Sequence, residues 1–310
     1  MNRFYLIERS DFMFEDIKRN KMKTGLIVSI FIVVITLIIY YICTYFDFGP
    51  FSIVYALAFS CISAWLSYYN SDKIILSMNH ARPATHEEDQ KLVNILDSLV
   101  VAAGLEDKPK LYVVESDQEN AFATGRNPQH AVICVTTGLS ERLDYYELEG
   151  VLAHELAHIK NYDIRLSAVV TVMVGLVVML ADICSRAIFW GVGEKDDDDR
   201  NGNPIVMLIG MVLLVLSPIF SKLIQLAISR RREFLADATA VQFTRNPEGL
   251  ISALEKISQD TSELQYANES TSHMYFSNPF KKKEGKKQRT DWFSTHPPIE
   301  ARIEALRNIH

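Results

Sequence analysis

The apolar residues of this chain are clustered, and this clustering restricts the possible folds more than any other feature. A helix needs about 20 apolar residues to cross a bilayer. Four windows reach or approach that length, at residues 25–42, 51–69, 166–189 and 204–219. The mean hydropathy of +0.05 is therefore an average over membrane and water-soluble parts. The sequence predicts two membrane hairpins, although the third and fourth windows also fit an apolar hairpin that does not fully span.

Charged residues beside the first two windows predict their orientation. Six Lys and Arg residues precede the first window, which lies too far into the chain and is too long for a usual cleaved signal. By the positive-inside rule, the N-terminus is then cytoplasmic. The turn at residues 44–50 contains Asp47 and no basic residue, whereas Lys73 and Arg82 follow the second window. The first hairpin is therefore expected to return the chain to the cytoplasmic side.

A short motif, His154-Glu155-Leu156-Ala157-His158, lies between the second and third windows. Two histidines four residues apart lie about one helical turn apart, so both imidazoles can reach one zinc ion. Glu155 points roughly 80° away from the mean direction of the two histidines, which suits a base that contacts a metal-bound water. Two surface histidines are the alternative. A catalytic zinc site needs a third protein ligand.

The predicted third ligand is Glu233. Glu233 and Asp237 lie on one helical face, so that one carboxylate can bind zinc and the other can brace a ligand histidine. A solvated acidic face beside the arginines at residues 230–232 is the alternative. The orientation predicted above places Glu233 on the same side of the membrane as His154 and His158, as a single ion requires.

Residues 81–165 have the pattern of a mixed α/β segment. A helix is predicted at residues 86–105 and strands at 110–115, 119–124 and 131–136. The second strand includes Asn120, Ala121 and Phe122. We expect these three residues to form an exposed sheet edge that accepts a peptide as an added strand, although an ordinary strand fits equally well.

The C-terminal part predicts an amphipathic helix at residues 247–259, a polar loop at 268–290 and a closing helix. His296 precedes two prolines and is a candidate donor to the oxyanion that forms when water attacks a peptide carbonyl. Arg302 is a candidate assistant. A capping turn before the closing helix explains the same residues without a catalytic role.

Charge and cysteine content exclude several classes of protein. A net charge of −6 argues against a nucleic-acid-binding protein, and the lysine cluster at residues 281–283 lies in a polar loop. None of the four cysteines forms a C-x-x-C pair, so neither a disulfide framework nor a thiolate metal site is implied.

Taken together, the motifs resemble the HtpX family of bacterial integral-membrane zinc metalloproteases, which are related to the CaaX prenyl protease. The likeness covers nearly the whole chain. It rests on the segments at residues 120–128, 154–158, 161–163, 233–237 and 294–298. The resemblance implies one Zn²⁺ per chain, bound by three residues and assisted by four others: His154, His158 and Glu233 as ligands, Glu155 as base, Asp237 behind a ligand, and His296 with Arg302 near the transition state.

The resemblance also implies an architecture and a role. The fold class is α+β, a mostly helical membrane protein with four transmembrane segments and a cytoplasmic zincin-like domain containing a small sheet. The expected parts are a basic segment with the first hairpin (1–80), the first half of the zincin-like domain (81–165), the second hairpin (166–228) and the helical second half (229–310). The expected location is the bacterial cytoplasmic membrane, and the expected substrates are misfolded or damaged membrane proteins.

Two other functions fit the same residues. Site-specific processing of a peptide precursor would use the same chemistry on a narrower substrate. A membrane scaffold or metal-responsive binding protein would carry the site without turnover, although such a protein would not require the water-activating Glu155. The sequence does not indicate an oligomeric state.

Overall fold

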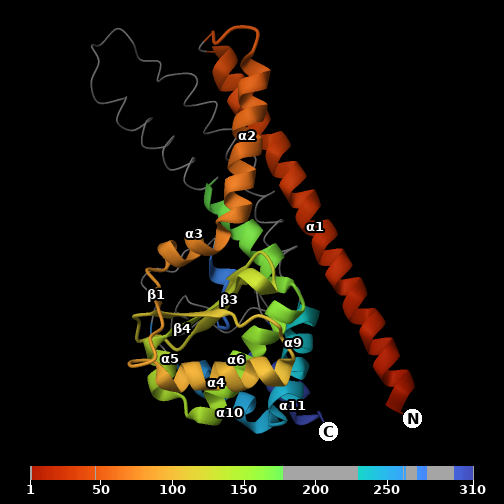
Figure 1. The fold of residues 1–310 in the computed structure, drawn as a ribbon, viewed down its shortest axis with the longest axis vertical. Helices are drawn as coiled ribbons and strands as arrows, with labels where there is room; N and C mark the ends of the chain where they lie inside the picture. Colours follow the sequence, from red (N-terminus) through yellow and green to blue (C-terminus); the bar gives the residue numbers. More distant parts are fainter. Residues whose placement is uncertain are drawn as a thin grey trace, which may run out of the picture.

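Two long helices form a hairpin that stands out from the rest of the protein (Figure 1). The computed structural model describes residues 2–45, 47–176, 230–260, 262, 271–277 and 297–309. Helix α1 is Asn2–Tyr45 and α2 is Ser52–Tyr69. Residues Asn20–Tyr40 and Ser52–Tyr69 are long and apolar enough to cross a membrane. The first two apolar windows are thus helices, and α1 continues well before its apolar part.

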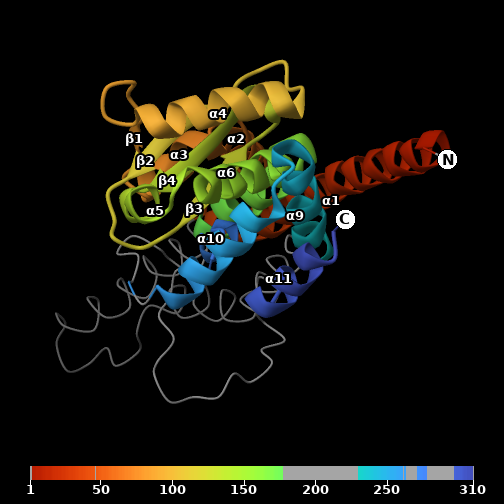
Figure 2. The ribbon, with the colours of Figure 1, turned by 90° about the horizontal axis from the view of Figure 1, so that it is seen from below.

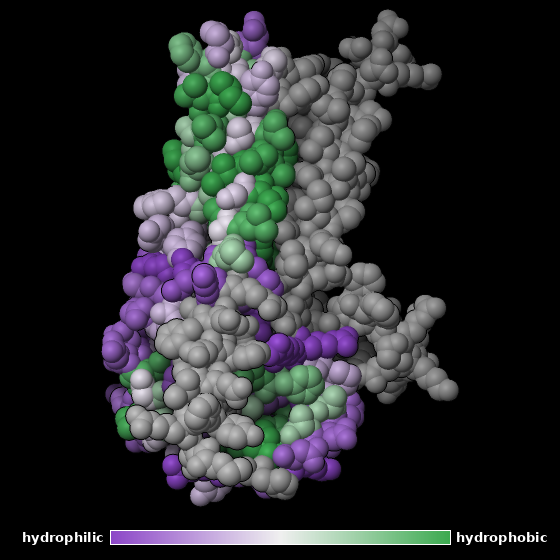
Figure 3. Space-filling view, turned by 90° about the vertical axis from the view of Figure 1, so that its right-hand side faces the viewer, coloured by the Kyte–Doolittle hydropathy of each residue, from purple (hydrophilic) through white to green (hydrophobic). Residues whose placement is uncertain are grey.

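The exposed surface of this hairpin is strongly apolar (Figure 3). Helix α2 leaves Trp65 58% and Ile62 58% exposed. The residues that α2 buries are all small and recur every three or four positions: Ser52, Ala56, Ser60, Ala64 and Ser67. A helix in a soluble protein buries its large apolar side chains, whereas small residues at helix contacts and large ones outside are typical of helices in lipid.

Only part of the second predicted hairpin can be compared with the structure. Residues 163–176 are helical and pack against α1 through Leu166, Val170 and Met173. The remainder of the third window, all of the fourth, and the acidic loop between them lie outside the described residues.

A four-stranded sheet lies at the centre of the part outside the helical hairpin, in the order β1-β2-β4-β3. The strands are β1 (Arg82–Pro83), β2 (Lys110–Val114), β3 (Ala121–Gly125) and β4 (Ala131–Thr136). Strands β2 and β4 are parallel, whereas β1 and β3 pair antiparallel to their neighbours. The three predicted strands are therefore present, and the strand containing Ala121 lies at the sheet edge. The pattern missed β1, which has only two residues.

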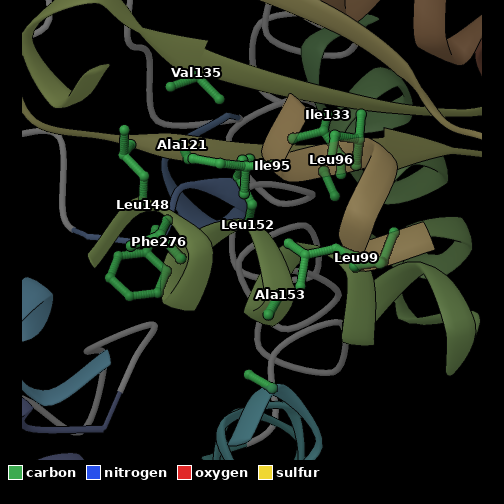
Figure 4. Packing of buried hydrophobic residues seen from close by; sticks show 14 of the residues in the cluster. Ile95, Leu96, Leu99, Ala121, Ile133, Val135, Leu148, Leu152, Ala153 and Phe276 are labelled. Atoms are coloured by element: carbon green, nitrogen blue, oxygen red, sulfur yellow. The ribbon is translucent and has the colours of Figure 1, made fainter. Parts of the chain in front are cut away.

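Both faces of β4 are buried, which explains its uninterrupted apolar sequence. Ile133 and Val135 face α4 (Gln90–Ala103) and α6 (Tyr145–Lys160), where they join the largest core (Figure 4). Val132 and Cys134 belong to a second core with α3 (Ser71–Met78) and the helix at residues 163–176. Helix α6 is thus held against the sheet before it reaches its two histidines.

The other helices complete the body around α6 (Figure 2). They are α5 (Thr137–Arg142), α9 (Arg230–Thr244), α10 (Pro247–Gln259) and α11 (Ile299–Arg307), with short 3₁₀ turns at Pro128–His130 and Ser272–Met274. Gly150 of α6 lets α10 approach closely, since a Cβ atom there would lie 2.9 Å from the Leu250 backbone.

A buried carboxylate fixes the start of α6. Asp144 and Glu147 form a capping box, in which each side chain accepts a hydrogen bond from the other residue's backbone N–H. Glu147 also accepts from Ser252 Oγ at 2.6 Å and from Lys256 Nζ at 2.7 Å, both on α10. One side chain therefore joins the motif helix to its neighbour.

We expect Glu147→Gln to destabilise the protein by about 1–3 kcal/mol at pH 7, because an amide cannot accept from all of these donors. Burial alone would raise the pKa of Glu147, but Lys256, Ser252 and the Asp144 N–H lower it below its ordinary value. The stabilisation is therefore complete above about pH 4.5 and is lost as the pH falls through the lower folded pKa. Thermal unfolding in detergent at pH 7 and pH 4 measures this difference.

The matched control is Glu141→Gln, which removes an exposed carboxylate from the neighbouring α5. An unfolding temperature for Glu147→Gln equal to that of the control at pH 7 would show that the network does not stabilise α6.

Candidate metal centre

Three donor groups from two helices meet at one point. His154 and His158 lie one turn apart on α6, and Glu233 projects from the first turn of α9, which packs along α6. One ligand atom from each residue lies within 4.8 Å of the others. The two Nε2 atoms are 3.1 Å apart, and the Glu233 carboxylate oxygens lie 3.7 Å from His154 Nε2 and 3.6 Å from His158 Nε2. The structure therefore brings the three predicted ligands together.

The spacing of these atoms fits a zinc ion. Ligands held tetrahedrally at about 2.0–2.2 Å from zinc are separated from one another by about 3.3–3.6 Å. The three separations in the structure lie within a few tenths of an ångström of that range. Two imidazoles and one carboxylate are also a donor set that catalytic zinc takes, leaving a fourth position open.

A carboxylate stands behind each histidine. His154 Nδ1 lies 2.8 Å from Asp237 Oδ1, and His158 Nδ1 lies 3.1 Å from Asp163 Oδ2. An ionised carboxylate only accepts hydrogen bonds, so each Nδ1 carries a proton, and each Nε2 is the ring nitrogen that would bind the ion. This arrangement orients a ligand histidine and raises its basicity.

Of these two carboxylates, the sequence assigned only Asp237. Asp163 was part of the family resemblance, but nothing in its spacing gave it a role. It follows the C-terminal turn of α6, where Tyr162 adopts a positive φ of 60° and separates α6 from the helix at residues 163–176. A helical pattern does not predict where a side chain after such a turn will point.

The carboxylates around His154 and His158 favour a positive charge between the two imidazole rings. Burial alone would lower the pKa of His158, but the hydrogen bond with Asp163 and the charge of Glu233 raise it to about 9. Burial would raise the pKa of Asp237, but the charge of Arg302 and the bond from His154 lower it to about 2. The negative charge that retains a proton on His158 would also attract a divalent ion.

Glu155 lies on α6 between the two histidines and is buried. Burial raises the pKa of its carboxyl group above the ordinary value, although the charges of His154 and His158 act in the opposite direction. A raised pKa suits a carboxylate that must accept a proton near neutral pH.

Arg302, the expected assistant of His296, lies behind His154 in the structure. It is 1% exposed, and its Nε and Nη2 donate to the two Asp237 oxygens at 2.9 and 2.7 Å. Its guanidinium group also lies over the Phe276 ring at 4.6 Å. These contacts favour a positioning role behind His154, because the bidentate pair fixes Asp237. His296, the expected donor to the oxyanion, lies outside the described residues.

The expected exposed edge is not exposed. Asn120, Ala121 and Phe122 are buried because residues 275–277 of the same chain pair with them. Phe276 N donates to Ala121 O at 2.7 Å. The side chain of Asn120 exchanges two hydrogen bonds with the Ser277 backbone. A strand pattern predicts an edge, but it does not predict which distant segment covers that edge.

The covered edge lies next to the three predicted ligands. The Phe276 ring packs edge-on against the His154 ring, with 5.0 Å between their centres. A residue paired with Ala121 therefore stands beside one of those histidines.

The chain is similar to known proteins over most of its length. A family model described as peptidase family M48 matches residues 86–310. A protease HtpX homolog of Caldanaerobacter subterraneus subsp. tengcongensis is 43% identical over 292 residues, covering 94% of this chain and 95% of the relative. A protease HtpX homolog of Listeria monocytogenes is 38% identical over 311 residues, covering 96% and 100%. The crystal structure of S. mikatae Ste24p aligns with a TM-score of 0.47 and 21% identity, covering 94% of this chain and 66% of that one.

Proposed function

This chain belongs to the HtpX proteases of peptidase family M48, and on that premise we propose that it is a membrane-bound zinc endopeptidase. His154, His158 and Glu233 hold the ion, and Glu155 is the general base. The observation that carries this proposal is the convergence of two imidazoles and a carboxylate within 4.8 Å, with another carboxylate behind each imidazole.

The chain's own residues account for the proton transfers. When bound, zinc supplies Lewis-acid polarisation of the peptide carbonyl and of the attacking water. Glu155 removes a proton from the attacking water as the water oxygen forms a bond to the carbonyl carbon. It then gives that proton to the amide nitrogen, so that the C–N bond breaks and a carboxylate and an amine are released. Asp237 and Asp163 hold the histidine rings in place, and Arg302 holds Asp237. His296 remains the proposed donor to the oxyanion.

A peptide substrate binds along β3. The bond between Ala121 O and Phe276 N already has the geometry of an added strand. A substrate residue in the place of Phe276 would lie against the His154 ring, beside the proposed ion. Binding at Asn120, Ala121 and Phe122 then requires residues 275–277 to leave the edge.

The contacts of the helical hairpin support a site close to the membrane surface. The turn after α6 leads directly into the helix at residues 163–176, which packs against the apolar part of α1. We place both the N-terminus and the site on the cytoplasmic side of a multi-pass protein in the bacterial cytoplasmic membrane, because basic residues are concentrated in the N-terminal part of α1, before residue 25. Membrane proteins and polypeptides near the bilayer are then the accessible substrates, which fits removal of misfolded or damaged proteins.

Cleavage of an unfolded polypeptide tests this function. We expect zinc-loaded full-length protein in detergent to cut a casein-type substrate at many positions, and a chelator to stop the cleavage. A peptide-library profile restricted to one cleavage sequence would indicate precursor processing instead. Zinc binding with no cleavage of casein or of any library peptide would indicate a binding protein and would overturn the proposal.

A further inference from the structure

One polar side chain on the first membrane helix contacts a carboxylate that lies behind a proposed zinc ligand. Asn20 opens the apolar part of α1, is 5% exposed, and donates from Nδ2 to Asp163 Oδ1 at 2.9 Å. The other oxygen of Asp163 is the one that faces His158 Nδ1. Asp163 therefore connects Asn20 of the membrane helix to His158, a proposed zinc ligand, through one contact on each of its two oxygens.

The amide of Asn20 is satisfied on both sides. Its Oδ1 accepts from Arg232 Nη1 at 3.4 Å, and the same nitrogen donates to Asp163 Oδ1 at 3.4 Å. Arg232 directly precedes Glu233 on α9. Asn20 thus lies between the end of the helix that carries the histidines and the start of the helix that carries the third ligand.

A second contact holds the same turn. Lys21 Nζ lies over the Tyr162 ring, 5.0 Å from its centre. Tyr162 has a φ of 60°, a conformation that is unfavourable for a residue with a Cβ atom. The backbone conformation of this turn, which directs Asp163 toward His158, is therefore unfavourable in isolation. The contact between Tyr162 and Lys21 of α1 helps to stabilise it.

We propose that Asn20 is a positioning residue for the metal site, which fixes the Asp163 carboxylate so that His158 presents Nε2 to zinc. This inference rests on the proposed zinc site. An asparagine is unfavourable in a helix interior, and burying its amide is costly unless it is hydrogen-bonded. A small apolar residue would pack against a neighbouring helix at less cost, so the contacts with Asp163 and Arg232 account for the amide at this position.

The test measures zinc affinity of the full-length protein in detergent, by competition with a chromophoric chelator. Removal of a carboxylate behind a metal ligand costs about 10–100-fold in affinity, so Asp163→Asn should fall in that range. Asn20→Ala acts one contact further away, and we expect a loss of about three- to tenfold. The double variant should be no weaker than Asp163→Asn alone, because both changes act through one carboxylate.

Thr24→Val is the matched control. Thr24 lies one turn along α1, is equally buried, and donates only to the backbone oxygen of Asn20. It should keep wild-type zinc affinity. Asn20→Ser, whose shorter side chain cannot reach Asp163, replaces Asn20→Ala if that variant does not fold, and should show the same loss.

Three results would overturn the inference: unchanged affinity in the Asn20 variants, an equal loss in Thr24→Val, or losses that multiply in the double variant. His158→Ala separates the two proposals. If it binds zinc as tightly as wild type, the metal site itself is wrong. If it loses zinc while the Asn20 variants do not, only the positioning role fails.

Discussion

Glu155→Gln is expected to lower kcat for peptide hydrolysis by about 10²–10⁴-fold, the contribution of a general base. The substitution keeps the shape of a side chain that is buried beside both histidines, so the fold should survive. Zinc content should stay at one ion per chain, because glutamine removes the proton acceptor without removing a proposed ligand. Cleavage of a fluorogenic peptide and metal analysis of the same sample measure both quantities.

Glu149→Gln is the matched control for this experiment. It makes the same change on α6, where burial also raises the pKa of the carboxyl group, but lies before the histidine pair. Its turnover should remain close to wild type. Wild-type turnover in Glu155→Gln would exclude Glu155 as the base, and loss of zinc would indicate that Glu155 is a ligand instead.

Glu233→Gln is expected to weaken zinc binding by more than about 100-fold, since a lost ligand should cost more than a lost outer partner. Only two imidazoles from one helix would remain at the site. Peptide hydrolysis should disappear at limiting zinc and return only in part at high zinc concentration. Chelator competition gives the affinity, and a titration of activity with zinc gives the rescue.

Glu248→Gln provides the comparison for Glu233→Gln. It removes an exposed carboxylate at the start of α10 and should bind zinc as wild type does. If Glu233→Gln also retained wild-type affinity, the third ligand would have to be another residue.

The predictable parts of this protein are those with a regular pattern. Histidines four apart on α6 have to share a face, and the apolar run of β4 has to be buried on both sides. The pairing of α6 with α9 was inferred from chemistry, because two histidines are an incomplete site and a carboxylate had to complete it. The structure brings His154, His158 and Glu233 together across 75 residues or more of sequence.

The parts that could not be predicted depend on contacts between distant segments. Asp163 braces His158 across a turn in which Tyr162 adopts a positive φ, and helical periodicity ends before that turn. Asn20 lies 143 residues away from Asp163, and no local pattern connects them. The pairing of residues 275–277 with the edge of β3 could not be predicted either, because these residues lie in a polar region without strand periodicity. Such contacts depend on how distant segments pack together, and the helical and strand periodicities of the sequence do not predict that packing.

X-ray absorption at the zinc edge of the purified full-length protein tests the central claim most directly. The account predicts one zinc ion per chain, with imidazole nitrogen at about 2.0–2.1 Å and carboxylate oxygen at about 2.0–2.2 Å, and loss of the imidazole signal in His154→Ala/His158→Ala. A sulfur shell at about 2.3 Å, or an unchanged spectrum in that double variant, would contradict it, because the ion would then be held by other residues.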